Sequence, residues 1–178
     1  MTLSSDLDAI RYPIGPFTAP DSVSSAQLQA WIEEIEQLPA TLRAVVSGLS
    51  EEQFDTPYRP GGWQVRQVVH HLADSHLNSF VRFRWALTED RPTIKAYYED
   101  RWAELPDYGH PVDGSLRLIE ALHARWVAFL RTLSADDLAR EFIHPESGVV
   151  RLAENVGIYA WHGKHHVAHI RIAAQAAS

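Results

Sequence analysis

The sequence predicts an all-α protein, a four-helix bundle built from a single domain. Apolar residues recur three and four positions apart in four long windows, which is the pattern of amphipathic helices. Prolines separate these windows, because a proline ring ends or bends a helix. The 178 residues correspond to one domain of ordinary size, and 46% of them are hydrophobic, which is enough for a buried core.

The first two helices follow an N-terminal arm that covers residues 1–22. The apolar stripe of the first helix runs from Ser24 to Leu49, with a kink expected at Pro39. The second helix follows the Pro-Gly-Gly turn at residues 60–62 and extends to about Glu89. Both helices are long enough to span a small bundle.

The second half of the chain begins with residues 91–112, which are rich in Pro, Tyr and charge and have no stable period. We expect a long loop there, with one short helical turn around Trp102, and this loop would allow a crossover connection. Asp113 is the expected N-cap of a third helix that reaches Leu133. A turn or small hairpin at residues 144–150 then leads into a last helix from about Leu152 to Ala174. Four such helices predict a bundle, whose interior is a usual place for a metal or ligand site.

Composition excludes several classes of protein. Lys and Arg number 16 against 23 Asp and Glu, a formal charge of −7, which argues against nucleic-acid and anionic-membrane partners. The absence of cysteine excludes disulfides, thiolate metal sites and a cysteine nucleophile. No basic segment precedes an apolar one at the N-terminus, and no apolar run has the length of a membrane span. We therefore expect a cytoplasmic protein.

Ten histidines are the unusual feature of the composition, and seven of them occur in two clusters. Histidines four residues apart on a helix share one face and can bind the same ion. At about 100° per residue, His166 lies about 50° and His162 about 90° from the apolar direction of the last helix, whereas His169 and His165 lie about 110° and 150° away. The pair His162 and His166 is therefore the better candidate for the inner edge of the bundle. The seven clustered histidines are His70, His71, His76, His162, His165, His166 and His169.

Periodicity alone does not decide which histidine is the third metal ligand. In the second helix His76 lies within about 20° of the apolar direction, whereas His71 lies about 120° and His70 about 140° away. Helical phase therefore favours His76 as the third ligand. The alternative for His76 is a core histidine that is hydrogen-bonded to a carbonyl or a carboxylate.

The segment from Asp55 to His76, DTPYRPGGWQVRQVVHHLADSH, resembles the signature of the DinB superfamily and, within it, of the YfiT-type branch of metal-dependent hydrolases. The segments RYPIG at residues 11–15 and YAWHGKHHVAHI at residues 159–170 resemble the same branch, so the resemblance covers almost the whole chain. A departure is Gln64, where that branch commonly has a Ser or Thr helix cap.

This resemblance implies a DinB-like four-helix bundle that forms a homodimer in the cytoplasm and holds one divalent metal ion, zinc or nickel, per subunit. The ligand in the second helix is then the histidine before Leu-Ala-Asp, which is His71. The other two ligands are His162, which follows a Trp, and His166, four residues further on. The resemblance thus agrees with helical phase in the last helix and implies His71 in place of His76.

Three neutral imidazoles leave a coordination position open, which is typical of catalytic metal sites. A water molecule there can be acidified and can attack a small-molecule substrate, which predicts a metal-dependent hydrolase. The first alternative is transfer of a low-molecular-weight thiol such as bacillithiol, where the thiol must arrive with the substrate because the chain has no cysteine. The second alternative is a non-catalytic, stress-associated bundle that only binds the metal.

The remaining polar candidates have weaker support. Asp74, His76 and His169 lie near enough in sequence to act as a general base, although each is more typical of a residue that supports a ligand. Arg11 and Arg59 could bind an anionic substrate or form partly exposed ion pairs. Three histidines, His110, His123 and His144, have no motif partner.

Overall fold

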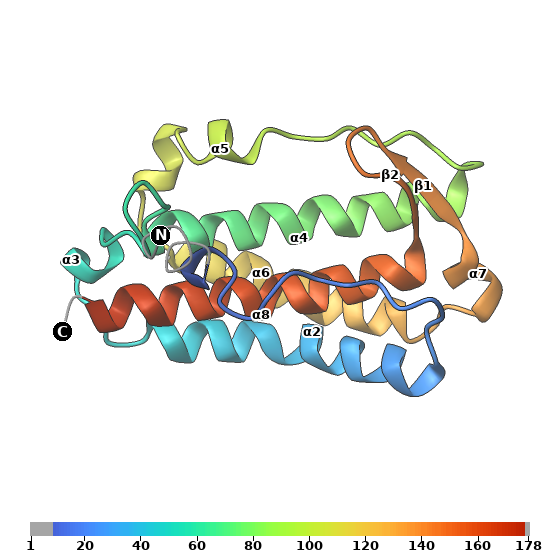
Figure 1. Cartoon of the computed structure of the whole chain (residues 1–178), viewed down its shortest axis with the longest axis horizontal. Coiled ribbons are helices and arrows are strands. Elements are labelled where there is room, and N and C mark those ends of the chain that lie inside the picture. The colour runs from blue at the N-terminus through green and yellow to red at the C-terminus, as the bar shows by residue number, and fades with distance from the viewer. Residues whose placement is uncertain (1–8, 177–178) are drawn as a thin grey trace.

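Four long helices lie side by side in the computed structural model, which describes residues 9–176 (Figure 1). They contact one another in a ring, α2 with α8 and α6, and α4 with α8 and α6. The predicted four-helix bundle is confirmed. The bounds of the helices are α2 (Ser25–Val46), α4 (Val65–Thr88), α6 (Asp113–Leu130) and α8 (Leu152–Ala176).

Local sequence signals explain most of the helix ends. The Ser24 hydroxyl accepts a hydrogen bond from the Gln27 backbone N–H and starts α2, which then continues through Pro39. This helix ends at Val46, earlier than the apolar stripe suggests, because Gly48 adopts a φ of 82°. At the start of α4 the Gln64 backbone N–H donates to the Gln67 side chain, so the helix is capped without a Ser or Thr.

The start of α6 differs by one residue from the prediction. Val112 is the N-cap, and Asp113 is the first helical residue. The Asp113 carboxylate pairs with Arg117 one turn later, and a negative charge is favourable in the first turn of a helix. Asp113 therefore marks this helix start through its charge and not as a capping residue.

The segment between α4 and α6 returns along the length of the bundle. In Figure 1 it passes over α4 from one end to the other, so that α4 and α6 run in the same direction. The expected helical turn at Trp102 is α5 (Glu99–Trp102), and a 3₁₀ helix, η1 (Pro106–Gly109), follows it. The segment predicted as a loop at residues 91–112 is thus a crossover with two short helices.

The remaining elements are short. A four-residue helix, α3 (Glu51–Phe54), precedes α4, and α7 (Ala135–Ala139) follows α6. The predicted hairpin is present as β1 (Glu141–His144) and β2 (Gly148–Arg151), antiparallel with Phe142 opposite Val150. Phe142 is buried and anchors the hairpin to the bundle core.

Close contact between α2 and α8 depends on two glycines of α8. A Cβ atom on Gly157 would lie 2.8 Å from the Trp31 ring, and one on Gly163 would lie 2.6 Å from a methyl group of Leu38. Glycine at these positions lets the two helices approach closely. None of the helices within residues 9–176 has the length and apolar character needed to cross a membrane.

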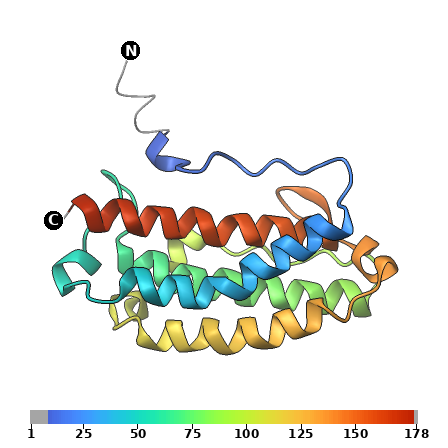
Figure 2. The ribbon, with the colours of Figure 1, turned by 90° about the horizontal axis from the view of Figure 1, so that it is seen from below.

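The N-terminal arm lies along α8. Of the predicted arm, residues 1–8 lie outside the described residues, and the part that follows runs beside α8 in Figure 2. The Trp161 indole N–H donates to the Gly15 carbonyl at 3.0 Å. The arm therefore covers a side of α8 that none of the other three long helices covers.

Candidate metal centre

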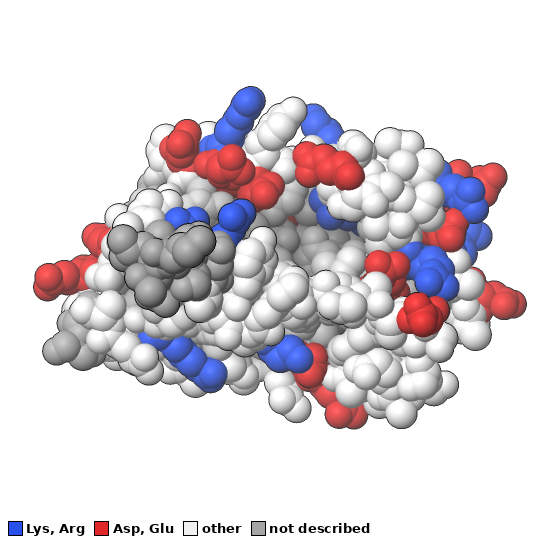
Figure 3. All heavy atoms as spheres, viewed as in Figure 1, with Lys and Arg blue, Asp and Glu red and all other residues white. Residues whose placement is uncertain are grey.

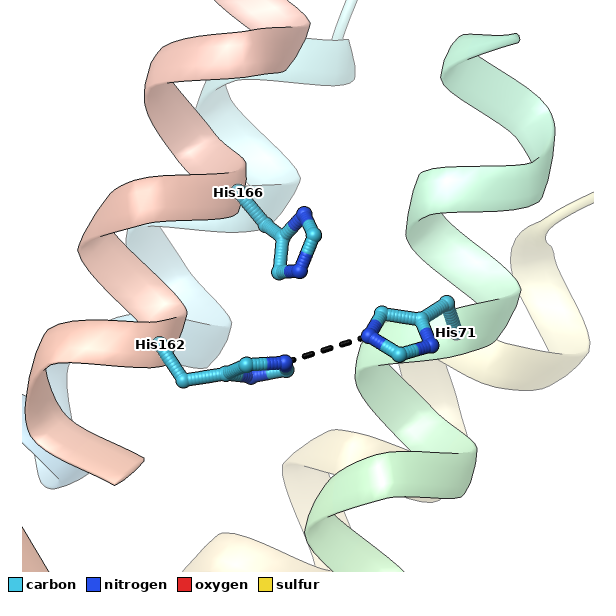
Figure 4. Close-up of side chains that lie close together, drawn as sticks. All are labelled: His71, His162 and His166. Carbon is cyan, nitrogen blue, oxygen red and sulfur yellow. Dashed lines mark hydrogen bonds between the residues drawn. The ribbon is translucent and has the colours of Figure 1, made fainter. Parts of the chain in front are cut away.

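Three histidine side chains from two helices point into one space between α4 and α8 (Figure 4). His71 comes from α4, and His162 and His166 come from successive turns of α8. One ring nitrogen of each lies within 4.8 Å of the others, and the Nε2 atoms of His71 and His162 are 3.1 Å apart. Two nitrogens bound to one tetrahedral zinc ion would be about 3.3 Å apart. The three residues named by the family resemblance thus have a spacing suited to a single ion.

Burial keeps these three imidazoles neutral. It lowers the pKa of His71 to about 3, and a nearby histidine, His165, lowers it further. The pKa values of His162 and His166 are also well below the usual value, first because of burial and then because of the neighbouring histidines. A neutral imidazole presents the lone pair that a metal ion requires.

A chain of hydrogen bonds assigns the proton of His162. The His123 Nδ1–H donates to the Ile35 carbonyl oxygen at 2.6 Å, because a carbonyl can only accept. His123 Nε2 therefore accepts from His76 Nδ1–H at 2.9 Å, and His76 Nε2 accepts from His162 Nδ1–H at 3.2 Å. Each neutral ring carries one proton, so His162 Nε2 has a free lone pair, and this atom faces the centre of the site.

A shorter chain does the same for His166. The His169 Nε2–H donates to the Arg11 carbonyl oxygen at 3.2 Å, which leaves His169 Nδ1 as an acceptor. His166 Nδ1 lies 3.4 Å from that atom and donates to it. The remaining nitrogen of His166, Nε2, keeps its lone pair. Backbone carbonyls at two places thus orient both α8 histidines for metal binding.

The structure places His76 behind the site and not in it. His76 is fully buried, and its two ring nitrogens contact His162 and His123. It is absent from the groups of residues 9–176 that could hold an ion. Helical phase identified the most deeply buried histidine of α4, but the side of this helix that carries His71 also meets α8, and His71 is the one that faces His162 Nε2.

A second histidine group shares one residue with the first. His165, His166 and His169 also lie within 4.8 Å of one another. Both ring nitrogens of His169, however, already have hydrogen-bond partners. This second group is therefore less suited to an ion than the first.

Although helical phase places His165 and His169 far from the apolar direction of α8, both are buried. His165 stacks on Trp161 with ring centroids 4.5 Å apart, and His169 stacks on Tyr58 at 3.9 Å. Both histidines are buried because the N-terminal arm and the turn before α4 cover that side of α8. Helical phase counts only the bundle as interior, so it misses this coverage.

The three histidines of the site line a cavity of about 610 Å³ that opens on the face shown in Figure 3. The N-terminal arm, the turn before α4, the crossover segment and the hairpin contribute the other walls. Arg11 and Arg59 are part of the lining, and neither forms an ion pair with any residue from 9 to 176. Arg59 donates instead to the Tyr58 hydroxyl and the Pro60 carbonyl.

None of the three expected base candidates is placed to act as one. Asp74 accepts a 2.6 Å hydrogen bond from the Tyr108 hydroxyl and is not part of the cavity lining. His76 and His169 use both of their nitrogens in the two hydrogen-bonded chains. Asp74 and His76 lie outside the cavity lining, and His169, which is part of it, has no free ring nitrogen.

Three polar residues near the site were missed in the sequence. Arg82 and His144 line the cavity, and His123 belongs to the chain behind His162. Arg82 is eleven residues after His71, which places it on nearly the same face of α4. His123 occurs in the apolar stripe of α6, four residues after Ile119 and three before Trp126. Its place on an apolar stripe could have identified His123, and the face that it shares with His71 could have identified Arg82.

We expect His76→Phe to lower metal affinity by about 10- to 100-fold, because phenylalanine fills the ring volume but cannot accept the proton of His162. His70→Phe is the matched control, since His70 points instead to the Ser115 hydroxyl and the His110 carbonyl. Competition with a chromogenic chelator measures both affinities. Equal metal affinities in the two variants would show that the hydrogen bonds behind His162 have no effect on its binding of the metal.

The chain is similar to known proteins in sequence and in structure. A family model described as DinB superfamily matches residues 34–170. Curated proteins of Bacillus cereus and Bacillus thuringiensis subsp. konkukian, each named "Putative metal-dependent hydrolase", are 54% identical over 164 residues, which is 92% of this chain and 95% of theirs. A solved structure, described as YfiT from Bacillus subtilis, a probable metal-dependent hydrolase with an unusual four-helix bundle topology, superimposes with a TM-score of 0.92 at 45% identity. That match covers 95% of this chain and 98% of the other.

Proposed function

The chain belongs to the DinB superfamily, and on this premise we propose that it is a metal-dependent hydrolase of a small-molecule substrate. The observation that carries the proposal is the convergence of His71, His162 and His166 at the wall of one cavity. The names of the curated relatives support the same reaction class.

The residues present fit a divalent ion. The lone pair of His162 Nε2 faces His71 Nε2 at 3.1 Å, and two facing lone pairs repel unless a proton or a cation lies between them. Imidazole nitrogen is a ligand for both zinc and nickel, and we propose one such ion per subunit. When bound, the ion supplies a Lewis acid and lowers the pKa of a coordinated water toward neutrality.

The chain itself contributes orientation and a dry environment. The two hydrogen-bonded chains hold the lone pairs of His162 and His166 toward the cavity, so binding needs no change of tautomer. Burial of all three rings keeps protons from competing with the ion at neutral pH. The cavity then holds the substrate beside the three histidines.

One observation favours thiol transfer as a second candidate. Asp74, His76 and His169 are all engaged elsewhere, so none of them serves as a base to activate water. A thiol needs less help, since coordination to a metal deprotonates it directly. The thiol would come from a co-substrate such as bacillithiol, because the chain contains no cysteine.

The assembly and its location follow from the same family resemblance. We propose a homodimer that works in the cytoplasm on a small molecule, without nucleic-acid or membrane partners. The formal charge of −7 supports the last point, because polyanions would be repelled. Sedimentation of the metal-loaded protein measures the oligomeric state.

Substrate profiling tests the function. Zinc- and nickel-loaded protein should hydrolyse some members of a panel of aryl esters and anilides, lose that activity on dialysis against a chelator, and regain it when metal is added. Turnover only in the presence of a thiol and an electrophile would identify the transferase. No turnover in either panel, with metal affecting only the unfolding temperature, would identify a non-catalytic metal-binding bundle.

A further inference from the structure

A buried arginine in the same cavity has no carboxylate partner within residues 9–176. Arg82 of α4 is 7% exposed, and its Nε atom is buried without a hydrogen bond. No carboxylate among residues 9–176 forms an ion pair with it. An arginine keeps its charge at all accessible pH values, and a buried unpaired charge is costly. By contrast Arg66, the other buried arginine at the opposite end of α4, pairs with two carboxylates, Glu51 and Asp55.

The position of Arg82 relates it to the metal centre. It follows His71 by eleven residues, which on a helix is a rotation of about 20° and a rise of about 16 Å. Helical side chains lean toward the N-terminus, so the guanidinium lies closer to His71 than this rise. Both residues line the one cavity, together with Ser75 between them. A ligand that touches the histidines can therefore extend along α4 toward Arg82.

A second donor lies beside Arg82. His144, at the end of β1, accepts hydrogen bonds at Nδ1 from the backbone N–H groups of Glu146 and Ser147, at 3.3 and 3.4 Å. Its proton is therefore on Nε2. His144 lines the cavity, and burial followed by the charge of Arg82 lowers its pKa, which keeps the ring neutral. The hairpin thus presents an N–H donor close enough to Arg82 to feel its charge.

Tyr97 completes this end of the cavity. It comes from the crossover segment, and burial raises the pKa of its hydroxyl, which keeps the O–H proton in place, while a hydrogen bond with Ser75 positions this hydroxyl. Arg82, His144 and Tyr97 all line this one cavity. A cation and two neutral donors from three separate segments thus line one cavity, and no carboxylate among residues 9–176 is paired with the cation.

We propose that Arg82, with His144 and Tyr97, binds a carboxylate of the substrate. A guanidinium offers paired N–H groups that match a carboxylate. A monoanion suits the site better than a phosphate dianion, because Arg82 is one positive charge and the exposed Glu99 and Glu146 also line the cavity. The assignment of this carboxylate to a substrate rests on the proposed function. The proposal that the site binds a carboxylate does not depend on that function.

Binding of glutarate, with glutaramide as the neutral counterpart, tests the proposal on protein freed of metal by dialysis. At constant ionic strength, glutarate should raise the unfolding temperature of the native chain, and glutaramide should not. Calorimetry should show glutarate binding at least about tenfold more weakly to Arg82→Met. Arg84→Met is the matched control, because Arg84 is on the same helix but lies over the Phe80 and Phe129 rings, outside the cavity. It should retain native glutarate affinity.

Stability separates a binding role from a structural one. Removal of a buried unpaired charge should leave the unfolding temperature of Arg82→Met unchanged or raise it. A clear loss of stability together with native glutarate affinity would overturn the proposal, as would equal glutarate affinity in all three proteins. Inorganic phosphate that binds more tightly than glutarate and depends on Arg82 would overturn the carboxylate assignment. These measurements need no turnover, so a failure of the hydrolase proposal is seen separately, in the ester and anilide panel.

Discussion

His162→Ala should abolish stoichiometric metal binding, whereas His165→Ala, on the same helix and three residues away, should leave it intact. The Nε2 lone pair of His162 points at His71, and alanine removes it. Loss of a ligand should exceed the roughly 10- to 100-fold effect of changing a residue that only supports one, so the affinity should fall by more than about 100-fold. Mass-spectrometric metal content after purification and chelator competition measure the loss.

The same measurements on two more variants distinguish the two histidine groups. His71→Ala should lose the metal as His162→Ala does. His169→Ala should lose only the modest share of metal affinity that comes from the hydrogen bond orienting His166. Retention of metal in His71→Ala with loss in His165→Ala and His169→Ala would instead assign the ion to the second group. Circular dichroism of each variant confirms that the bundle is folded.

The metal-free protein should unfold as the pH falls from about 6.5 to 5. Burial lowers the pKa of His71 to about 3 and that of His123 to about 4, so between these values and 6.5 the unfolded chain binds more protons than the folded one. Stability therefore rises with pH in this window and is lost on acidification. Each of these two histidines lowers the unfolding free energy by about 2 kcal/mol at pH 5 relative to neutral pH.

The other buried histidines have lowered pKa values as well and act in the same direction. All of these shifts act against an unfolding free energy that is about 5–15 kcal/mol for a typical domain. Guanidinium titrations at pH 7.5, 6 and 5 measure the unfolding free energy directly. Equal values at the three pH points would contradict the prediction.

A single substitution isolates one histidine in this effect. His123→Gln should reduce the pH dependence by about 2 kcal/mol between pH 7.5 and 5, because the variant has one fewer group that takes up a proton on unfolding. His110→Gln is the control, since His110 is exposed and should leave the pH dependence unchanged. Bound zinc should move the transition to lower pH, because protons must then compete with the ion.

The sequence by itself determined the four helices and two of the three histidines of the site. Apolar spacing, prolines and glycine turns are local signals, and they located α2, α4, α6 and α8 to within a few residues. His162 and His166 share one helix, so their common face follows from helix geometry alone. The family resemblance, and not periodicity, named His71.

Only the tertiary structure decided which side of α4 meets α8, and with it the convergence of His71 on the other two histidines. An apolar stripe defines one direction, whereas α4 is buried on several sides. The chain from His162 to the Ile35 carbonyl joins α8, α4, α6 and α2, and no local pattern connects these elements. Arg82 and a hairpin histidine 62 positions later in the chain line the same cavity. Such contacts depend on how distant segments pack, because helical periodicity carries information only about neighbours within the same helix.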